Sequence, residues 1–268
     1  MKNDLIVTLV ETDLIWESPE ENRSVIEEKL TKHSSPTDLF ILPEMFTSGF
    51  TMNPNKVAEA MEGTTVTWLK QLSKVKEAAI CGSLVIEEDG QYVNRFIFVT
   101  PENDLWYYDK KHTFTLAGEH KAYKAGSEKL SFEYQGWRIC PMICYDLRFP
   151  VWARNTEDYD LLVYVANWPK PRINAWDTLL KARAIENMSY CIGVNRSGFD
   201  GNGHEYPGHC GIYNVLGEAI DLKKDSYSEL LTTKLDHRSI AKYRNKLNFL
   251  KDRDHFQLME EMSQYNQS

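Results

Sequence analysis

Residues 140–150 read CPMICYDLRFP, an apolar run that stops abruptly in polar residues. Alternation along an extended strand places Cys140, Met142 and Cys144 on one face. The two cysteines then lie about 13 Å apart, whereas a disulfide requires Cα atoms within about 7 Å. The pair therefore cannot bridge within a strand, and two cysteines alone are weak evidence for zinc. Cys140 is expected to be a small buried apolar residue.

Cys144 differs from Cys140 because it lies where the predicted strand ends and the chain turns towards a helix. Such a junction holds a side chain rigidly at the sheet edge, beside backbone N–H groups, as in nucleophile elbows. A thiol there becomes nucleophilic only if a base removes its proton. None of the seven histidines is local to Cys144 in the sequence. The base must therefore come from another part of the chain.

Charged residues end two other predicted strands. Glu44 ends DLFILPE, and Lys110 ends LWYYDK. Ligand sites in open α/β sheets collect at the carboxyl ends of strands, so both side chains could converge on Cys144. From position alone, a charged residue at a strand end is more often a solvated turn residue than a catalytic one.

Short apolar runs alternate with helical patterns along the whole chain, which predicts a mixed α/β fold. No linker, charge block or low-complexity segment interrupts it, so we expect one domain over residues 1–268, with a core over about 4–235. Helices are predicted over residues 18–30, 63–78, 149–157 and 174–188, and strands over 4–10, 38–44, 79–88, 94–100, 105–110, 137–144, 159–167, 189–195, 210–215 and 228–235.

Two details of the helical segments are also predicted. In the helix over 63–78, the residues Val66, Leu69, Leu72 and Val75 recur on one side and should face the core. The tail, about 239–268, is polar and helical in pattern, and could serve as an arm on a partner subunit.

Composition excludes some classes of function. The chain has 268 residues and a formal net charge of −8, which argues against nonspecific nucleic-acid binding. An anionic substrate would need a local arginine or lysine. No signal-peptide pattern or membrane-length apolar run is visible. Five dispersed cysteines, an odd number, fit reduced thiols, so a cytoplasmic protein without membrane association is expected.

Three motifs occur in the order typical of the nitrilase, or carbon-nitrogen hydrolase, superfamily, which the chain resembles from residue 4 to about 235. LFILPEMFTSGF is similar to the segment of the family's general base, which implies this role for Glu44. YYDKKHTF resembles the segment of the catalytic lysine, which stands two residues before the histidine and is therefore Lys110. ICYDLRFPVWAR resembles the nucleophile segment, with Cys144 as nucleophile. Glu119, in LAGEHKAYKAG, matches a second glutamate near the site.

The resemblance implies a four-layer α-β-β-α sandwich that pairs through helices into a dimer or a higher homo-oligomer. It implies amide hydrolysis through a Cys thioester, with no metal or organic cofactor. Glu44 would take the thiol proton, and Lys110 and the backbone N–H of Tyr145 would bind the oxyanion.

The local sequence in segments such as YDLRFPVWARN and VANWPKPRINAW most resembles that of bacterial omega-amidases. These enzymes hydrolyse small 2-oxo acid monoamides such as 2-oxoglutaramate and 2-oxosuccinamate. The carboxylate of such a substrate needs a cation, for which Arg148, Arg172 and Arg183 are candidates. Arg183 is expected to form a structural ion pair with Glu186, Arg148 could instead fix the turn after Cys144, and Arg172 is favoured. Four aromatic residues are expected either to wall the pocket or to belong to the core: Phe46, Phe114, Tyr145 and Trp168.

Other functions remain open at this point. Within the superfamily, the alternatives are a deaminated glutathione amidase, an N-carbamoyl amino acid amidohydrolase and a true nitrilase. A catalytically idle binding scaffold is a further alternative, although such a protein has no physical need for the costly strand-end charges. A thiol redox protein is disfavoured because the chain has no C-x-x-C motif.

Overall fold

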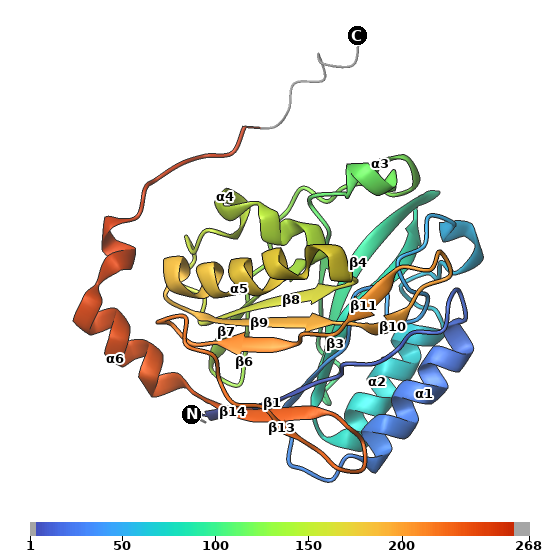
Figure 1. Ribbon diagram of the computed structural model, residues 1–268, viewed down its shortest axis with the longest axis horizontal. Coiled ribbons are helices and arrows are strands. Elements are labelled where there is room, and N and C mark those ends of the chain that lie inside the picture. The colour runs from blue at the N-terminus through green and yellow to red at the C-terminus, as the bar shows by residue number, and fades with distance from the viewer. Residues whose placement is uncertain (1–3, 260–268) are drawn as a thin grey trace.

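Two β-sheets face each other and carry helices on their outer sides in the computed structural model, which describes residues 4–259 (Figure 1). One sheet has seven strands in the order β13-β14-β1-β2-β3-β4-β5, and the other has five in the order β12-β9-β8-β7-β6. The helices α1 and α2 cover the first sheet, and α4 and α5 cover the second. The predicted α-β-β-α arrangement is therefore confirmed.

The strands of the two sheets come from both halves of the chain. The seven-stranded sheet contains β1 (Asp4–Leu9), β2 (Leu39–Ile41), β3 (Ala79–Glu88), β4 (Gln91–Val99), β5 (Leu105–Asp109), β13 (Lys223–Lys224) and β14 (Leu231–Asp236). The five-stranded sheet contains β6 (Phe132–Tyr134), β7 (Trp137–Ile143), β8 (Leu161–Ala166), β9 (Tyr190–Asn195) and β12 (Gly211–Tyr213). A separate hairpin joins β10 (Ser197–Phe199) to β11 (Glu205–Pro207).

The helices are α1 (Pro19–Lys32), α2 (Thr64–Lys76), α3 (Glu119–Ala122), α4 (Pro150–Ala153), α5 (Ile173–Asn187) and α6 (His237–Leu247). The helix expected over 149–157 is therefore only one turn long. The side of α2 that faces the core carries Val66, Leu69 and Leu72, which are buried, but Val75 is 78% exposed. The prediction for Val75 was wrong, because a three-residue step falls short of a full helical turn, so three such steps place Val75 about 180° around the helix from Val66.

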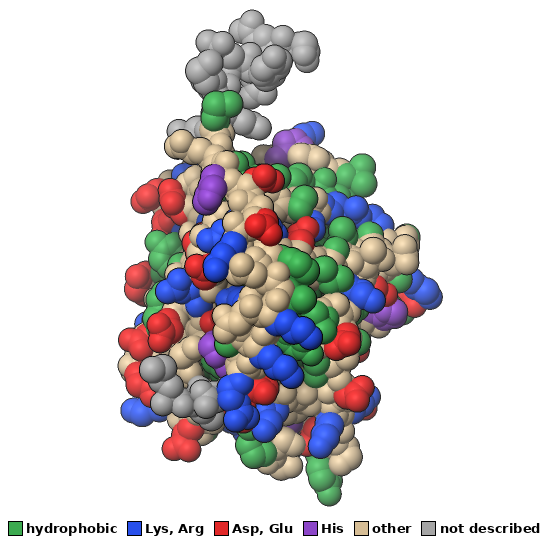
Figure 2. Space-filling model, turned by 90° about the vertical axis from the view of Figure 1, so that its left-hand side faces the viewer, with side chains coloured by type: hydrophobic (Ala, Val, Ile, Leu, Met, Phe, Trp, Pro, Cys, Tyr) green, Lys and Arg blue, Asp and Glu red, His purple; other side chains and the backbone are tan. Residues whose placement is uncertain are grey.

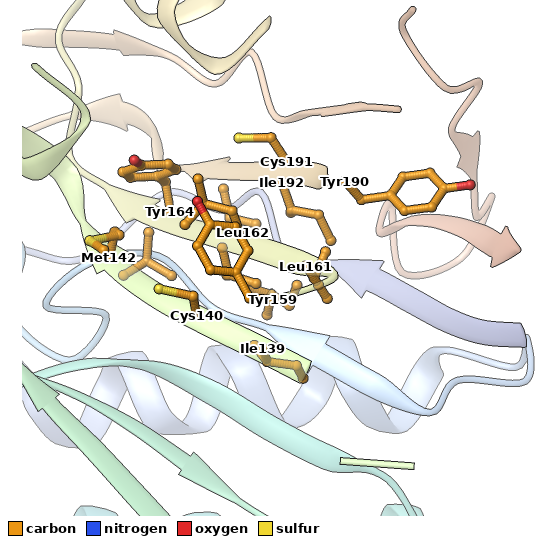
Figure 3. Packing of buried hydrophobic residues seen from close by; sticks show 14 of the residues in the cluster. Ile139, Cys140, Met142, Tyr159, Leu161, Leu162, Tyr164, Tyr190, Cys191 and Ile192 are labelled. Atoms are coloured by element: carbon orange, nitrogen blue, oxygen red, sulfur yellow. The ribbon is translucent and has the colours of Figure 1, made fainter. Parts of the chain in front are cut away.

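The main hydrophobic core extends over both faces of the five-stranded sheet and includes the face of β7 that carries Cys140 and Met142 (Figure 3). Cys140 and Met142 are fully buried, among apolar residues of β7, β8 and β9. Burial raises the pKa of Cys140 to about 12, so this thiol stays protonated. Cys140 and Cys144 are both free thiols. The expectation that Cys140 is a core residue is confirmed.

The C-terminal helix α6 packs against the edge of the molecule, on the face where basic, acidic and apolar side chains are interspersed (Figure 2). Ile240 is buried, and Arg244 donates to the carbonyl of Met188 at 2.9 Å and to Asp160 at 3.0 Å. The described part of the predicted tail is thus anchored as far as α6, whereas residues 260–268 lie outside the described residues. Its role as an arm on a partner subunit stays a prediction. Within residues 4–259, no helix combines the length and the apolar character that crossing a membrane requires.

Candidate active site

Cys144 stands directly after β7, at the start of a 3₁₀ turn over Cys144–Arg148. Its backbone has φ +43°, a left-handed conformation that costs a non-glycine residue energy and is common at functional sites. The turn is stabilised by Asp146, whose carboxylate accepts a hydrogen bond from the backbone N–H of Ile143 at 3.0 Å. Cys144 therefore lies at a strand end, where the sequence predicted it, and its strained backbone is a further feature that the sequence did not indicate.

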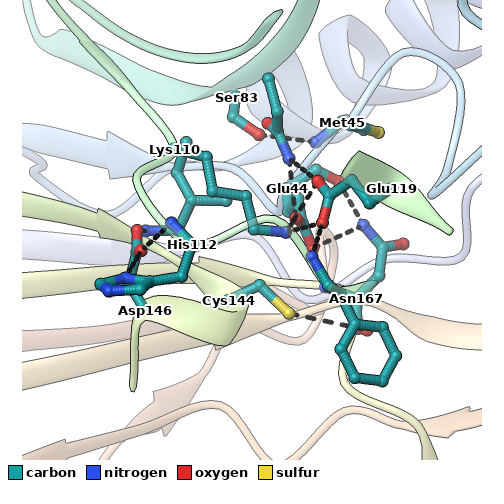
Figure 4. A network of polar contacts seen from close by, with 12 residues as sticks. Glu44, Met45, Ser83, Lys110, His112, Glu119, Cys144, Asp146 and Asn167 are labelled. Carbon is teal, nitrogen blue, oxygen red and sulfur yellow. Dashed lines mark hydrogen bonds and ion pairs between the residues drawn. The ribbon is translucent and has the colours of Figure 1, made fainter. Parts of the chain in front are cut away.

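Lys110 follows β5 and lies over the site in Figure 4, with only 1% of its surface exposed. Its backbone N–H donates to the carbonyl of Asn94 on β4 at 2.9 Å, which continues the strand pairing. Its Nζ donates to Glu44 Oε1 at 2.9 Å and to both carboxylate oxygens of Glu119 at 3.0 Å. One buried cation thus joins two buried carboxylates.

Glu44 comes three residues after the end of β2 and is fully buried. Its Oε1 also accepts from Asn94 Nδ2 at 2.8 Å, and its Oε2 accepts from the backbone N–H of Asn167 at 2.8 Å. Asn167 Nδ2 donates in turn to the carbonyl of Glu44 at 2.7 Å. Asn94 belongs to one sheet and Asn167 follows β8 of the other, so both sheets orient the carboxylate.

Glu119 is the first residue of α3 and is also fully buried. Besides Lys110, its carboxylate accepts from the backbone N–H of Phe114. Asn94 Nδ2 lies 3.5 Å from Glu119 Oε1 and so contacts both glutamates. The structure therefore brings Glu44, Lys110 and Glu119 into one network beside Cys144, although they are far apart in the sequence.

Charges in this network shift the pKa values of its members. Burial alone would lower the pKa of Lys110, but Glu119 and Glu44 offset this effect and raise it, so the ammonium stays charged. Burial and the charge of Glu44 raise the pKa of the Cys144 thiol well above its usual value, although Lys110 acts in the opposite direction. Burial also raises the pKa of Glu119. The resting thiol is therefore protonated and needs a base when it reacts.

The thiol of Cys144 faces a cavity of about 460 Å³. The cavity is lined by residues from several loops, including Phe50, Phe114, Tyr145, Trp168 and Arg172. A volume of this size is sufficient for a small organic substrate.

Phe46 is not part of this wall. It is fully buried in the core against Trp68, with ring centroids 6.3 Å apart, and it fills the space above Gly82. A Cβ atom on Gly82 would lie 2.8 Å from the Phe46 ring. The prediction that Phe46 walls the pocket is corrected: Phe50, four residues later in the same loop, lines the cavity instead.

Two of the three candidate arginines line the cavity. Arg148 lies 5.1 Å from the centroid of the Trp168 ring, and Arg172 lies 5.1 Å from that of Phe114. Among residues 4–259, the guanidinium of neither makes an ion pair or a hydrogen bond to another side chain. The third, Arg183, pairs with Glu186 at 2.9 Å and donates to the carbonyl of Leu147 at 2.6 Å, as expected of a structural residue. Two unpaired cations therefore face the space beside the thiol.

The only carboxylate among the described residues that line the cavity is that of Asp200, and it is already saturated. It accepts from Tyr206 Oη at 2.9 Å and from the backbone N–H groups of Asn202 and His204, both at 2.9 Å. Its oxygens therefore stabilise its own loop, and among residues 4–259 it forms no ion pair with Arg148 or Arg172.

Comparison with known proteins identifies the family. Residues 7–245 match the model of the carbon-nitrogen hydrolase family. The chain belongs to this family. An omega-amidase, YafV, from Yersinia enterocolitica is 42% identical over 255 residues, which cover 95% of this chain and 99% of that one. A 2-oxoglutaramate amidase from Bacillus subtilis (strain 168) is 32% identical over 219 residues, with 80% and 84% covered.

Solved structures of the carbon-nitrogen hydrolases agree with this assignment. A superfamily protein from Xanthomonas campestris, described with an arsenic adduct in its active site, is 40% identical and superposes with a TM-score of 0.91 over 96% of this chain and 100% of that one. Nit3 of Saccharomyces cerevisiae is 20% identical, with a TM-score of 0.77 over 92% of this chain and 95% of that one, and so shows the shared fold. The family and the fold expected from the sequence motifs are confirmed, and the chain is an amidohydrolase.

Sequence reasoning missed four residues that shape the site. Asn167 is the first polar residue after the apolar strand β8, the same signal that singled out Glu44. Asn94 interrupts an otherwise apolar run in β4. Asp146 and Phe50 carry no such signal, because their importance depends on contacts with distant parts of the chain.

Proposed function

We propose that this carbon-nitrogen hydrolase is an omega-amidase that converts a small 2-oxo acid monoamide, such as 2-oxoglutaramate or 2-oxosuccinamate, to the dicarboxylate and ammonia. The observation that carries the proposal is the pair of unpaired guanidiniums, Arg148 and Arg172, in the same cavity as Cys144. An amide with a carboxylate at its far end matches a cavity that is lined by a nucleophile and by two guanidinium groups that form no ion pair within the described residues. The identity to omega-amidases over nearly the whole chain supports the same substrate class.

The proposed reaction starts when Cys144 Sγ attacks the amide carbon while Glu44 accepts the thiol proton. The oxyanion formed from the amide oxygen is stabilised by the Lys110 ammonium and the backbone N–H of Tyr145. Glu44 then passes its proton to the amide nitrogen, the C–N bond breaks, and ammonia leaves a thioester. Water attacks the thioester, Glu44 takes its proton, and the thiolate leaves and is reprotonated. Glu119 keeps Lys110 charged and in place.

The substrate carboxylate is assigned to Arg172. A charge-assisted contact between a guanidinium and a carboxylate contributes about 1.5–3 kcal/mol. This corresponds to roughly a ten- to hundredfold preference for the acid over a neutral analogue. The Phe114 ring lies 5.1 Å from the Arg172 guanidinium, a cation–π contact that leaves the N–H groups of the guanidinium available to the substrate.

The experiment that tests the proposal compares ammonia release from 2-oxoglutaramate and from its methyl ester. The wild type should prefer the free acid by about ten- to hundredfold in kcat/KM. Arg172→Met should remove most of this preference by slowing hydrolysis of the acid alone. Lys170→Met is the matched control, because Lys170 is a nearby exposed cation that is already paired with Glu205 at 2.8 Å. Equal efficiency on acid and ester in the wild type would overturn the omega-amidase assignment and leave the Cys144 chemistry standing.

The alternatives within the family are separated by the same assay. Faster release from deaminated glutathione, an N-carbamoyl amino acid or a nitrile than from any ω-amide would replace the proposed substrate. An idle scaffold would release no ammonia, whereas an active enzyme should release at least one equivalent per Cys144 in the first turnover.

We also propose that the protein is a cytoplasmic homodimer or higher homo-oligomer. Exposed apolar side chains on the outer helices support pairing through this face: Val151 on α4 is 51% exposed and Ile185 on α5 is 45% exposed. Light scattering coupled to size-exclusion chromatography measures the mass directly. A mass near the 31.1 kDa of one chain would contradict the proposal.

A further inference from the structure

One buried carboxylate outside the Glu44–Lys110–Glu119 network connects the two catalytic segments. Asp146 is fully buried and lies two residues after Cys144. Its Oδ2 accepts from the backbone N–H of Ile143 at 3.0 Å and from Tyr108 Oη at 2.8 Å. Its Oδ1 accepts from the backbone N–H of His112 at 3.0 Å and from His112 Nδ1 at 2.8 Å. All four donors flank either Cys144 or Lys110 in the sequence.

These contacts cross the gap between the sheets. Tyr108 belongs to β5 of the seven-stranded sheet, and Ile143 ends β7 of the five-stranded sheet. Tyr108 Oη also accepts from the backbone N–H of Lys111 at 3.1 Å, which fixes the chain directly after Lys110. Figure 4 shows the Asp146–His112 pair on one side of Lys110 and the two glutamates on the other. The Lys110 segment is therefore fixed from both sides.

The His112 ring completes this arrangement. It stacks on Phe149, with centroids 3.7 Å apart and an interplanar angle of 3°. Phe149 follows the 3₁₀ turn that begins at Cys144, so the ring packs on one end of that turn and its Nδ1–H donates to Asp146 within the turn. The side chain of His112 is 22% exposed, so it is not a core residue.

We propose that Asp146 and His112 are positioning residues that set the separation between the Cys144 thiol and the Lys110 ammonium. This inference rests on the proposed function, because it assigns the pair to the same reaction. Neither side chain makes a contact with Glu44, Lys110 Nζ or the thiol among the described contacts, so the pair acts through the backbone on both sides. An error of about 1 Å in the position of a reacting group can cost about a hundredfold in rate.

The test uses His112→Ala, because this change removes the ring but keeps the backbone N–H and the whole of Asp146. We expect kcat on 2-oxoglutaramate to fall about 10- to 100-fold, with KM changed less than about threefold. The rate at which iodoacetamide alkylates Cys144, read by mass spectrometry of the labelled peptide, should fall in parallel. His112→Asn should restore most of both rates, because its side-chain amide can donate to Asp146 in place of Nδ1.

His209→Ala is the matched control. His209 also pairs with an aspartate through Nδ1, at 3.2 Å from Asp177, but on an exposed surface. This variant should keep the wild-type kcat and alkylation rate. The proposal is overturned if His112→Ala keeps both rates, or if it loses activity and melting temperature together and His112→Asn restores neither. Alkylation needs no substrate, so a failure of the omega-amidase assignment would leave this readout intact and distinguishable.

Discussion

Two buried cations, Arg95 and Lys110, lie close together where β4 pairs with β5, but their surroundings differ. Arg95 on β4 pairs in register with Asp109 on β5, and Lys110 is the next residue along the chain. Both cations are 1% exposed, and each contacts two carboxylates. Arg95 binds Asp109 at 2.7 and 2.8 Å and Glu88 at 2.9 and 2.8 Å. The composition of the two clusters is therefore nearly the same.

The exposure of the carboxylates separates the clusters. The side chains of Glu88 and Asp109 are 50% and 21% exposed, whereas those of Glu44 and Glu119 are fully buried. The pKa of Glu88 is lowered, mainly by its hydrogen bonds to Arg95. The pKa of Glu119 is instead raised by burial. Solvated carboxylates stay ionised in a stable ion pair, while buried ones near a thiol can exchange a proton.

The largest expected effect comes from removing the nucleophile beside the Lys110 cluster. Cys144→Ala should lower kcat by about 10⁴- to 10⁶-fold, because no other group can form the thioester. The melting temperature should change little, since the side chain is only partly buried. Ammonia release and thermal unfolding measure the two quantities.

Cys140→Ala provides the contrast within the same strand. It removes a sulfur atom from the hydrophobic core, so it should reduce stability and leave kcat nearly unchanged. A normal melting curve with lost activity would reverse the assignment of the two sulfurs.

The second prediction concerns the cation of the reactive cluster. Lys110→Met should lower kcat by about two to three orders of magnitude, because the oxyanion loses a charged donor. Lys111→Met should have a small effect, since Lys111 Nζ lies 5.5 Å from the centre of the Trp152 ring and outside the network. A greater loss in Lys111→Met would mean that the lysine of the motif is assigned one residue too early.

The third prediction is for the solvated cluster. Arg95→Met should lower the free energy of unfolding by about 1–3 kcal/mol, a moderate loss because the two carboxylates left behind can still reach water. Urea denaturation measures this change, and kcat/KM should stay at the wild-type value. Arg95→Lys keeps the charge but loses the planar fork, and should be intermediate in stability. A loss of turnover without a loss of stability would show that the two clusters are coupled.

The smallest effect is a shift in the pKa of the Cys144 thiol. Burial and the charges of Glu44 and Glu119 raise this pKa, so Glu44→Gln removes one of the causes and should lower the pKa of the thiol. In a titration from low to high pH, the thiolate of Glu44→Gln should therefore form at a lower pH than that of the wild type. Turnover should be lost in this variant because Glu44 is the proposed base. The difference in ultraviolet thiolate absorbance from the Cys144→Ala protein follows the titration. A pKa that rises in Glu44→Gln would contradict this electrostatic account.

Much of the fold and of the reactive network was predictable from local sequence. The helix expected over 18–30 is α1 (Pro19–Lys32), and strand ends supplied Glu44, Lys110 and Cys144 as candidates. This worked because polar residues directly after apolar runs are both unusual and confined to one edge of a sheet. The catalytic roles of these residues stay predictions until the variants are measured.

The rest depended on packing that no local pattern encodes. Phe46 and Phe50 have similar neighbours in the sequence, and only the space above Gly82 decides that the first belongs to the core. Asn94 was part of a predicted strand, but its contact with both glutamates requires the register of β4 against β5. For the same reason, the sequence did not indicate that Arg95 pairs with carboxylates on both neighbouring strands, Glu88 on β3 and Asp109 on β5.

The contacts that orient Glu44 join residues far apart along the chain, and this sets when the site can form during folding. Glu44 and Lys110 are 66 residues apart, and Glu44 and Asn167 are 123 apart. Contacts of such long range form late, because the entropy of closing the intervening loops is lost before they stabilise the chain. In a refolding experiment, circular dichroism should therefore recover before ammonia release. During synthesis on the ribosome, Cys144 is made before Asn167, the residue after β8 that orients Glu44. The growing chain would therefore stay inactive until β8 has been made and the two sheets have docked.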